Sequence, residues 1–449
     1  MSALRRVVLA TLLAVVACAA GAVPHALAAP EVVLADGGFM DVAIDPDSGR
    51  SVAISSDLAP GSRPGSMTMR LYATALDATG RPSGAANMFG DGFSPDFMGP
   101  HLISMATDVR RGRHLVAYTA TKPGMGSSPC EPLPTPPPGA IVFPTDTQRQ
   151  CAIVDQEIFV RVLDRAGRAV GPERQITSIG APASGLFRSG APNVAYDARS
   201  DSFVVVFSAL VTGDQHASAL LSQRLRADGA PLGAPRALAL QPGPLAYRPQ
   251  AALLADPRGG SLLVYTWGQA GQQRLYARRM RADGALQGTT SVLTGTGIGG
   301  FEVDFDRRHR RVLVVYTRGG GVENGIRARL LSAGGRPLAA PANLPYRIGA
   351  GGVSIASGND RGRWLYGFVR EGKALERQAF VQSADSHGRP QGRARALSPA
   401  SKSSAAPPLL TAARRGTVLA RWFVAPIVCD SGGGCTTGAG SLHLRLIRP

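Results

Sequence analysis

Hydrophobic and polar residues alternate over short stretches along most of the chain. In one recurring unit an alternating segment ends at an aspartate-led turn and a more apolar segment follows, as in Asn193–Asp197 before Phe203–Phe207. The aspartate recurs at Asp45, Asp108, Asp197, Asp256 and Asp306. Period-two alternation with many β-branched residues is typical of β-strands. The pattern therefore predicts a series of antiparallel hairpins and excludes a helical solenoid.

A glycine marks a second kind of turn and recurs as Gly80, Gly167, Gly229, Gly284, Gly335 and Gly388. Two of these turns, Leu225–Gly233 and Met280–Gly288, are near copies of each other. Glycine supplies the positive φ that a tight strand-to-strand turn needs. The two kinds of turn together predict four strands, A to D, in a repeat of about fifty residues. Seven copies begin near Phe39, His101, Pro192, Pro249, Phe301, Val353 and Leu409.

The two ends of the repeat array complement each other. The seventh copy ends in a C strand at Leu442–Pro449, and Ala29–Asp36 supplies a D strand with nothing before it. We therefore expect an all-β, seven-bladed ring of four-stranded antiparallel blades, whose last blade is closed by the N-terminal strand. Over residues 29–449 this arrangement resembles the β-propeller superfamily. The signatures of individual subfamilies are absent, so the resemblance implies a fold and no particular function.

The N-terminal segment predicts export. Two arginines precede an apolar run, Val7–Val23, and small residues stand at Ala26 and Ala28, as in a signal peptide cleaved after Ala28. The predicted organisation is a signal peptide over residues 1–28 and a single domain over 29–449. A second interpretation takes Val15–Cys18 as a lipobox, with Cys18 as a lipid anchor. The protein would then be a membrane-anchored lipoprotein instead of a free periplasmic or secreted protein. No later segment reaches the length of a transmembrane helix.

The remaining four cysteines form two local pairs, Cys130 with Cys151 and Cys429 with Cys435. An even number of cysteines in an exported chain favours two disulfides. A metal site is disfavoured because the spacing contains no C-x-x-C and no histidine clusters nearby. We also expect no cofactor, because phosphate-loop and haem-attachment motifs are absent.

The chain carries a net charge of +18, which has two interpretations. Such a charge can attract nucleic acid, anionic lipid or acidic glycan. All the basic residues except Lys122, Lys373 and Lys402 are arginine, however, and they are spread along the chain, which favours a codon bias. The densest run, Arg307–Arg311, falls at a predicted turn tip. A nucleic-acid partner is therefore disfavoured.

Most of the variation in length falls in the B–C loops and the D–A connections. Three B–C loops are enlarged, in blades that would be neighbours in the ring. They are Ser55–Thr68, Thr119–Gln156 and Ala425–Ser441, in blades 1, 2 and 7. Variable loops on a rigid scaffold are where binding usually occurs. The principal hypothesis is an exported cell-envelope binding or scaffold protein that recognises a protein or glycan partner through this surface.

Polar residues near the starts of the A strands give a second hypothesis. The candidates for acid–base chemistry are Asp41, Asp96, His101, Glu302 and Asp304. If these carboxylates and the histidine converge at the central channel, they suit a glycan-active hydrolase or lyase. Each also has an ordinary structural interpretation, as a solvated strand end, a packed histidine or a turn former.

Overall fold

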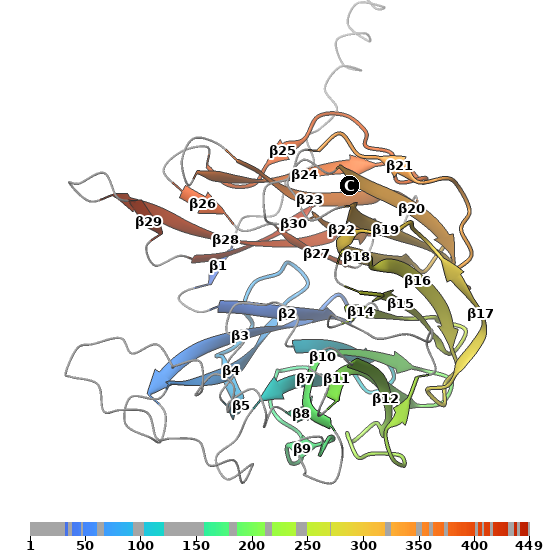
Figure 1. Cartoon of the computed structure of the whole chain (residues 1–449). Coiled ribbons are helices and arrows are strands. Elements are labelled where there is room, and N and C mark those ends of the chain that lie inside the picture. Colours follow the sequence, from blue (N-terminus) through green and yellow to red (C-terminus); the bar gives the residue numbers. More distant parts are fainter. Residues whose placement is uncertain are drawn as a thin grey trace, which may run out of the picture.

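The computed structural model describes residues 32–34, 38–45, 48–60, 67–92, 103–120, 157–178, 186–211, 218–238, 249–269, 271–318, 325–346, 353–358, 362–371, 376–399, 403–405, 408–413, 416–429, 435–437 and 441–447. These residues form strands and turns and contain no α-helix. Seven blades of four antiparallel strands surround a common axis (Figure 1). The predicted all-β, seven-bladed architecture is confirmed.

The first four blades are separate four-stranded sheets in chain order. Blade 1 consists of β2 (Gly38–Ile44), β3 (Ser51–Pro60), β4 (Met67–Leu76) and β5 (Asn87–Gly92), and blade 2 of β6 (Ile103–Asp108), β7 (Arg113–Ala120), β8 (Glu157–Leu163) and β9 (Arg174–Gln175). Blade 3 consists of β10 (Leu186–Asp197), β11 (Ser202–Val211), β12 (Ser218–Arg226) and β13 (Arg236–Ala237). Blade 4 consists of β14 (Ala251–Ala255), β15 (Ser261–Trp267), β16 (Arg274–Met280) and β17 (Leu286–Val292).

The remaining blades complete the ring. Blade 5 consists of β18 (Ile298–Asp306), β19 (Arg311–Arg318), β20 (Ile326–Ser332) and β21 (Ala342–Asn343), and blade 6 of β22 (Val353–Ser357), β23 (Trp364–Glu371), β24 (Arg377–Ala384) and β25 (Arg395–Ala396). Blade 7 contains β27 (Leu409–Ala412), β28 (Val418–Cys429) and β30 (Ser441–Ile447). The N-terminal β1 (Val32–Leu34) pairs antiparallel with β30, with Val32 opposite Leu444. A short connection, β26 (Ser403–Ala405), pairs with both β24 and β28 and joins blades 6 and 7 into one sheet.

Two of the three predicted B–C loops are largely extensions of strands, which corrects the prediction. The β3–β4 ladder continues to the pair Pro60 and Met67. In blade 7, β28 runs on to Cys429 and pairs with β29 (Cys435–Thr437). Continued ladder hydrogen bonds satisfy the backbone more fully than an irregular loop would. Both hairpins project on the same side of the molecule (Figure 1). Most of the third segment, Thr119–Gln156, lies outside the described residues.

The C–D turns confirm the predicted role of the repeated glycine. All six glycines have φ between 74° and 84°. A Cβ on Gly388 would also lie 2.8 Å from Leu313 Cδ1 of the preceding blade. The glycine therefore permits both the turn and the close packing of neighbouring blades.

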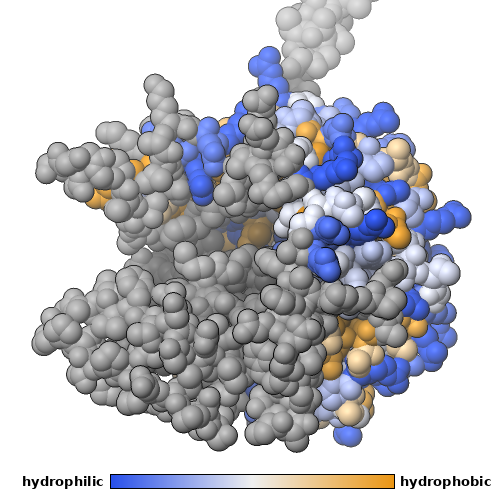
Figure 2. Space-filling model, in the orientation of Figure 1, coloured by the Kyte–Doolittle hydropathy of each residue, from blue (hydrophilic) through white to orange (hydrophobic). Residues whose placement is uncertain are grey.

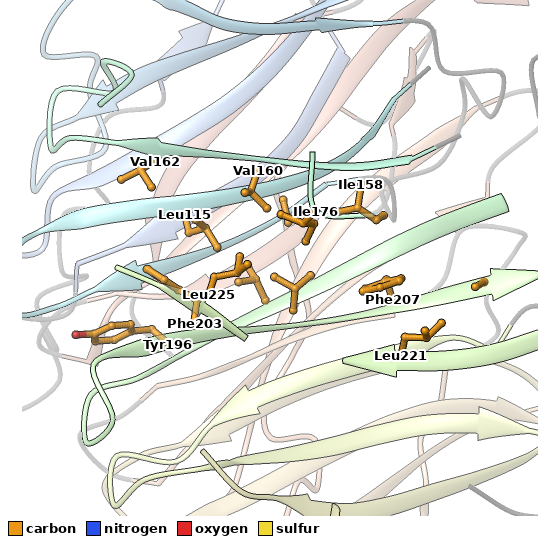
Figure 3. Close-up of a cluster of buried hydrophobic side chains, with 14 residues drawn as sticks. Leu115, Ile158, Val160, Val162, Ile176, Tyr196, Phe203, Phe207, Leu221 and Leu225 are labelled. Carbon is orange, nitrogen blue, oxygen red and sulfur yellow. The ribbon is translucent and has the colours of Figure 1, made fainter. Parts of the chain in front are cut away.

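Hydrophobic clusters hold the blades together, one at each of the seven interfaces among the described residues. At the interface of blades 2 and 3, Leu115 and Ile158 meet Phe203 and Phe207 (Figure 3). Each such side chain contributes about 1.5–3 kcal/mol when it is fully buried. Six of the clusters hold ten to fourteen buried residues, whereas the cluster between blades 7 and 1 holds five. The ring-closing interface is thus the one with the smallest described apolar cluster.

The described surface mixes hydrophilic residues with separate hydrophobic patches (Figure 2). The large exposed hydrophobic side chains, Met88, Val292, Leu338 and Val428, come from different blades. Scattered residues of this kind are normal on a protein surface. No helix in the described part of the chain has the length and hydrophobicity to cross a membrane.

Candidate functional site

The A strands lie next to one another around the axis and are connected by hydrogen bonds from backbone to side chain. In each case a backbone N–H of one A strand donates to a side-chain oxygen of the preceding A strand. The three bonds are Met105 N to Asp41 Oδ2 (2.9 Å), Val194 N to Ser104 Oγ (3.1 Å) and Ser357 N to Asp304 Oδ2 (2.5 Å). Two of the predicted catalytic carboxylates, Asp41 and Asp304, therefore connect blades.

Asp41 also faces a buried cation from the last blade. Arg421 lies on β28, and its Nη2 is 3.4 Å from Asp41 Oδ1. The other amino group, Nη1, donates to Thr411 Oγ1 at 3.1 Å. The Arg421 side chain is 7% exposed and the Asp41 side chain 24%. This ion pair spans the interface between blades 7 and 1, where the described apolar cluster is smallest.

Glu302, on β18 of blade 5, belongs to the same electrostatic cluster. Burial raises the pKa of Glu302, Arg421 lowers it and the Asp41 carboxylate raises it, and the net result is a pKa of about 7. Burial likewise raises the pKa of Asp41 and lowers the pKa of Arg421. Glu302 is only partly buried, and its carboxylate makes no hydrogen bond within the described ranges. Side chains from blades 1, 5 and 7 thus converge electrostatically, and Glu302 is the carboxylate whose oxygens are not already engaged.

Asp304 lies two residues further along β18. Burial raises its pKa to about 6, and the N–H groups of Ser357 and Phe305 oppose this shift by stabilising the carboxylate. An acceptor already engaged by a neighbouring blade is a poor base, because proton uptake would weaken a structural hydrogen bond. Asp304 is therefore better suited to connecting blades 5 and 6 than to catalysis.

Several predicted site residues cannot be placed. Asp96, His101, Cys130, Cys151 and Cys18 lie outside the described residues. Cys429 stands directly opposite Cys435 in the β28–β29 ladder. Facing positions in a ladder suit a disulfide, and both disulfides remain predictions. Within the described ranges, no group of three or more metal-ligating side chains could hold a metal ion.

Sequence reasoning missed Arg421, although the repeat contains a signal for it. The register of blade 7 places Arg421 where blades 1 and 4 carry Ile54 and Val264, both fully buried. A charge at such a position costs several kcal/mol unless it is paired. Aligning the B strands by repeat would therefore have identified Arg421 as a residue that needs an anionic partner.

The cluster is suited to moving a proton beside a negatively charged ligand. A group with a pKa near 7 exchanges protons efficiently at neutral pH. Arg421 supplies a positive charge in a region shielded from water, where its field is less screened. The arrangement therefore combines one acid–base group, Glu302, with one cation.

Comparisons with known proteins identify the fold. No family model and no curated protein matches the sequence. Among solved structures, the chain is similar to an ulvan lyase of a polysaccharide lyase family, with TM-score 0.50, 10% identity, and coverage of 91% of this chain and 96% of that chain. It also aligns with the polysaccharide lyase Uly1 (TM-score 0.48, 10% identity, 93% and 91% coverage). A third alignment is with a mutant NanB sialidase from Streptococcus pneumoniae (TM-score 0.48, 9% identity, 93% and 70% coverage). At this identity the likeness to the ulvan lyase supports the β-propeller architecture and leaves the chemistry to the residues themselves.

Proposed function

We propose that the protein is a glycan-active enzyme that cleaves a uronate-containing polysaccharide by β-elimination. The observation that carries the proposal is Glu302, a partly accessible carboxylate whose pKa is raised to about 7 and which lies in the field of Arg421. The predicted alternative of a channel-centred lyase or hydrolase thus replaces the binding or scaffold hypothesis as the main proposal. We further propose that the enzyme acts outside the cytoplasm, as the predicted signal peptide implies.

The chemistry assigns one task to each side chain. Deprotonated Glu302 removes the proton from the ring carbon beside the uronate carboxylate. Arg421 stays bonded to Asp41 and Thr411, and its positive field stabilises the negative charge that builds up on the uronate carboxylate. The electron pair forms a ring double bond while the glycosidic oxygen on the next carbon leaves and takes a proton from solvent. The products are a new chain end and an unsaturated uronate.

Elimination fits better than hydrolysis because, among the candidate carboxylates that the structure describes, only Glu302 has its oxygens available. Glycoside hydrolysis normally uses two carboxyl groups on opposite sides of the scissile bond. Asp41 accepts N–H bonds from Val42 and Met105, and Asp304 accepts one from Ser357. The solved ulvan lyase, which shares the fold, also acts on an acidic polysaccharide by its printed description.

The test is a panel of uronate-containing and neutral polysaccharides incubated with the purified full chain. We expect ultraviolet absorbance from the unsaturated uronate with one or more acidic polymers. Glu302→Gln should lower kcat by about 100-fold or more, the usual size of a lost general base. Glu371→Gln is the matched control, because this glutamate is 46% exposed and pairs with Arg377 on blade 6.

The other outcomes separate the alternatives. New reducing ends without ultraviolet absorbance would indicate a hydrolase instead of a lyase. Glycan binding without turnover would restore the binding-protein hypothesis. Full activity in Glu302→Gln would remove Glu302 from the mechanism.

A further inference from the structure

A row of exposed arginines lies on the face of the ring that carries the A–B and C–D turns, here called the turn face. In four successive blades, 2 to 5, an arginine stands two residues after the aspartate that leads the A–B turn. These residues, here called the arginine arc, are Arg110, Arg199, Arg258 and Arg308, and all four side chains are exposed. The four leading aspartates, Asp108, Asp197, Asp256 and Asp306, are 0–5% exposed. At these four A–B turns the arc arginines therefore face solvent and the leading aspartates are buried.

Contacts between consecutive A–B turns place the arc residues in one row. Arg111 of blade 2 pairs with Asp201 of blade 3 at 2.6 Å. Gly260 N of blade 4 donates to Asp197 Oδ2 of blade 3 at 3.0 Å. Because neighbouring turns touch in this way, the arc is a continuous feature of the surface.

The same chain of contacts continues into blade 5. Arg310 Nη2 lies 3.0 Å from Asp256 Oδ2 of blade 4. These turn-to-turn bonds use arginines other than the arc residues. The positions of the A–B turns that carry the arc are therefore held by other side chains.

The side chains of Arg110, Arg199 and Arg258 are not needed to build the turns that carry them. Within the turns, the leading aspartates accept bonds from the backbone N–H groups of Arg110, Arg199 and Arg258, at 2.8–3.0 Å. Any non-proline residue supplies such an N–H group. A structural requirement for an aspartate-led turn therefore does not explain why arginine recurs at this position.

A second row of arginines lies further from the axis on the same face. An exposed arginine directly follows the turn glycine in four blades, as Arg81, Arg168, Arg336 and Arg389. In blades 3 and 4 the same turn forms with Ala230 and Ala285. The arginine side chain is again unnecessary for the turn, and it adds positive charge beside the arc.

We infer that the arginine arc binds an anionic polysaccharide along the turn face. Guanidinium groups bind carboxylate, sulfate and phosphate groups in a bidentate manner, and a row of them suits a polymer with regularly spaced anions. The described A–B and C–D turns carry no phenylalanine, tyrosine or tryptophan on which bases could stack, so the surface suits a glycan better than single-stranded nucleic acid. This inference does not need Glu302 to be catalytic, because the turn face lies away from the starts of the A strands.

The experiment measures salt-dependent binding to an immobilised sulfated glycan, heparin, with soluble heparin, neutral dextran and duplex DNA as competitors. The test variant is Arg110→Ala/Arg199→Ala/Arg258→Ala/Arg308→Ala. The matched control, Arg236→Ala/Arg274→Ala/Arg318→Ala/Arg393→Ala, removes the same charge from exposed arginines outside these turns. We expect the arc variant to bind on the order of tenfold more weakly than wild type, with the control close to wild type.

Three results would overturn the inference. Equal weakening in both variants would mean a non-specific effect of net charge. Unchanged binding in the arc variant would place the glycan elsewhere. Stronger competition by DNA than by soluble heparin would make the surface a nucleic-acid site.

Two further variants separate this inference from folding and from the proposed function. Should the arc variant fold poorly by circular dichroism, Arg81→Ala/Arg168→Ala/Arg336→Ala/Arg389→Ala tests the outer row with a residue that blades 3 and 4 already carry. This variant is expected to weaken heparin binding by a smaller factor, and no change in it would also count against the inference. Glu302→Gln should bind heparin as wild type does, whatever its effect on turnover.

Discussion

Asp41 should contribute more to stability than its ion-pair partner Arg421, although the two share one interaction. Asp41→Ala removes the acceptor of two backbone N–H groups and leaves the Arg421 cation, 7% exposed, without its nearest counter-charge. Removing one member of a buried pair typically costs about 3–5 kcal/mol. Arg421→Met leaves a carboxylate that is 24% exposed and keeps both N–H bonds. Because that carboxylate can also bind a proton, we expect a cost of about 1–2 kcal/mol.

Urea unfolding at neutral pH measures this difference. The set is wild type, Asp41→Ala, Arg421→Met and the double variant, followed by circular dichroism and tryptophan fluorescence. Replacing a whole buried pair is often close to neutral, so the double variant should be more stable than the sum of the two single effects by about 1–3 kcal/mol. The exposed pair Glu371 and Arg377, 3.6 Å apart, is the control and should show coupling of about 0.5 kcal/mol or less.

Two results would refute this reasoning. A larger loss in Arg421→Met than in Asp41→Ala would show that the N–H bonds of Asp41 are dispensable. Additive effects of the two single variants would show that the ion pair contributes no coupling energy to stability.

Three other perturbations test separate parts of the structure. The pKa of Glu302 is about 7 in the folded protein and 4.5 ordinarily, so its contribution to stability is complete below pH 4.5 and is lost as the pH rises through 7. Between pH 4 and 8 the melting temperature of wild type should therefore fall relative to that of Glu302→Gln. Parallel curves for the two proteins would contradict this prediction. Gly388→Ala should lower the free energy of unfolding by at least about 1 kcal/mol more than Gly392→Ala does, because both glycines have positive φ but only a Cβ at position 388 would contact neighbouring atoms. Equal urea midpoints for the two variants would contradict the packing argument. Arg111→Ala should lower the urea midpoint at pH 7, because it removes the ion pair with Asp201. Because Arg111 lowers the pKa of Asp201, the difference from wild type should shrink as the pH falls below the ordinary value of 3.8, and a constant difference would argue against the pair.

The architecture could be predicted from the sequence because the same two kinds of turn recur in the repeats. The leading aspartates and the turn glycines depend on local backbone geometry, which single residues determine. β22 and β27 begin at the predicted Val353 and Leu409. The start of β10 was missed, since it begins at Leu186 and bends through a register shift between Gly190 and Asn193. Such a shift depends on pairing with β11 and has no local signature.

The candidate site could be predicted only in part, because it depends on side chains from distant blades. Glu302 and Asp41 were recognised as polar residues of A strands. Nothing in the local sequence shows that the Asp41 carboxylate accepts backbone hydrogen bonds whereas the Glu302 carboxylate is available. That difference arises from Met105 N, which comes from the next blade. Arg421 was missed because its partner lies 380 positions away in the sequence. Contacts of this kind join residues that are distant in the sequence, so they can be recognised only once the arrangement of the blades in the closed ring is known.

The interface between blades 7 and 1 also sets an order of assembly. The other six interfaces join blades that are neighbours in the chain, so each can form soon after its second blade is synthesised. This interface has to wait for the last strands, and closing so long a loop carries the largest entropic cost. Until then Val42, Ala53 and Leu76 remain exposed on the first blade. A chain interrupted before blade 7 would therefore present this apolar edge to chaperones and proteases, so that incomplete molecules are distinguished from finished rings.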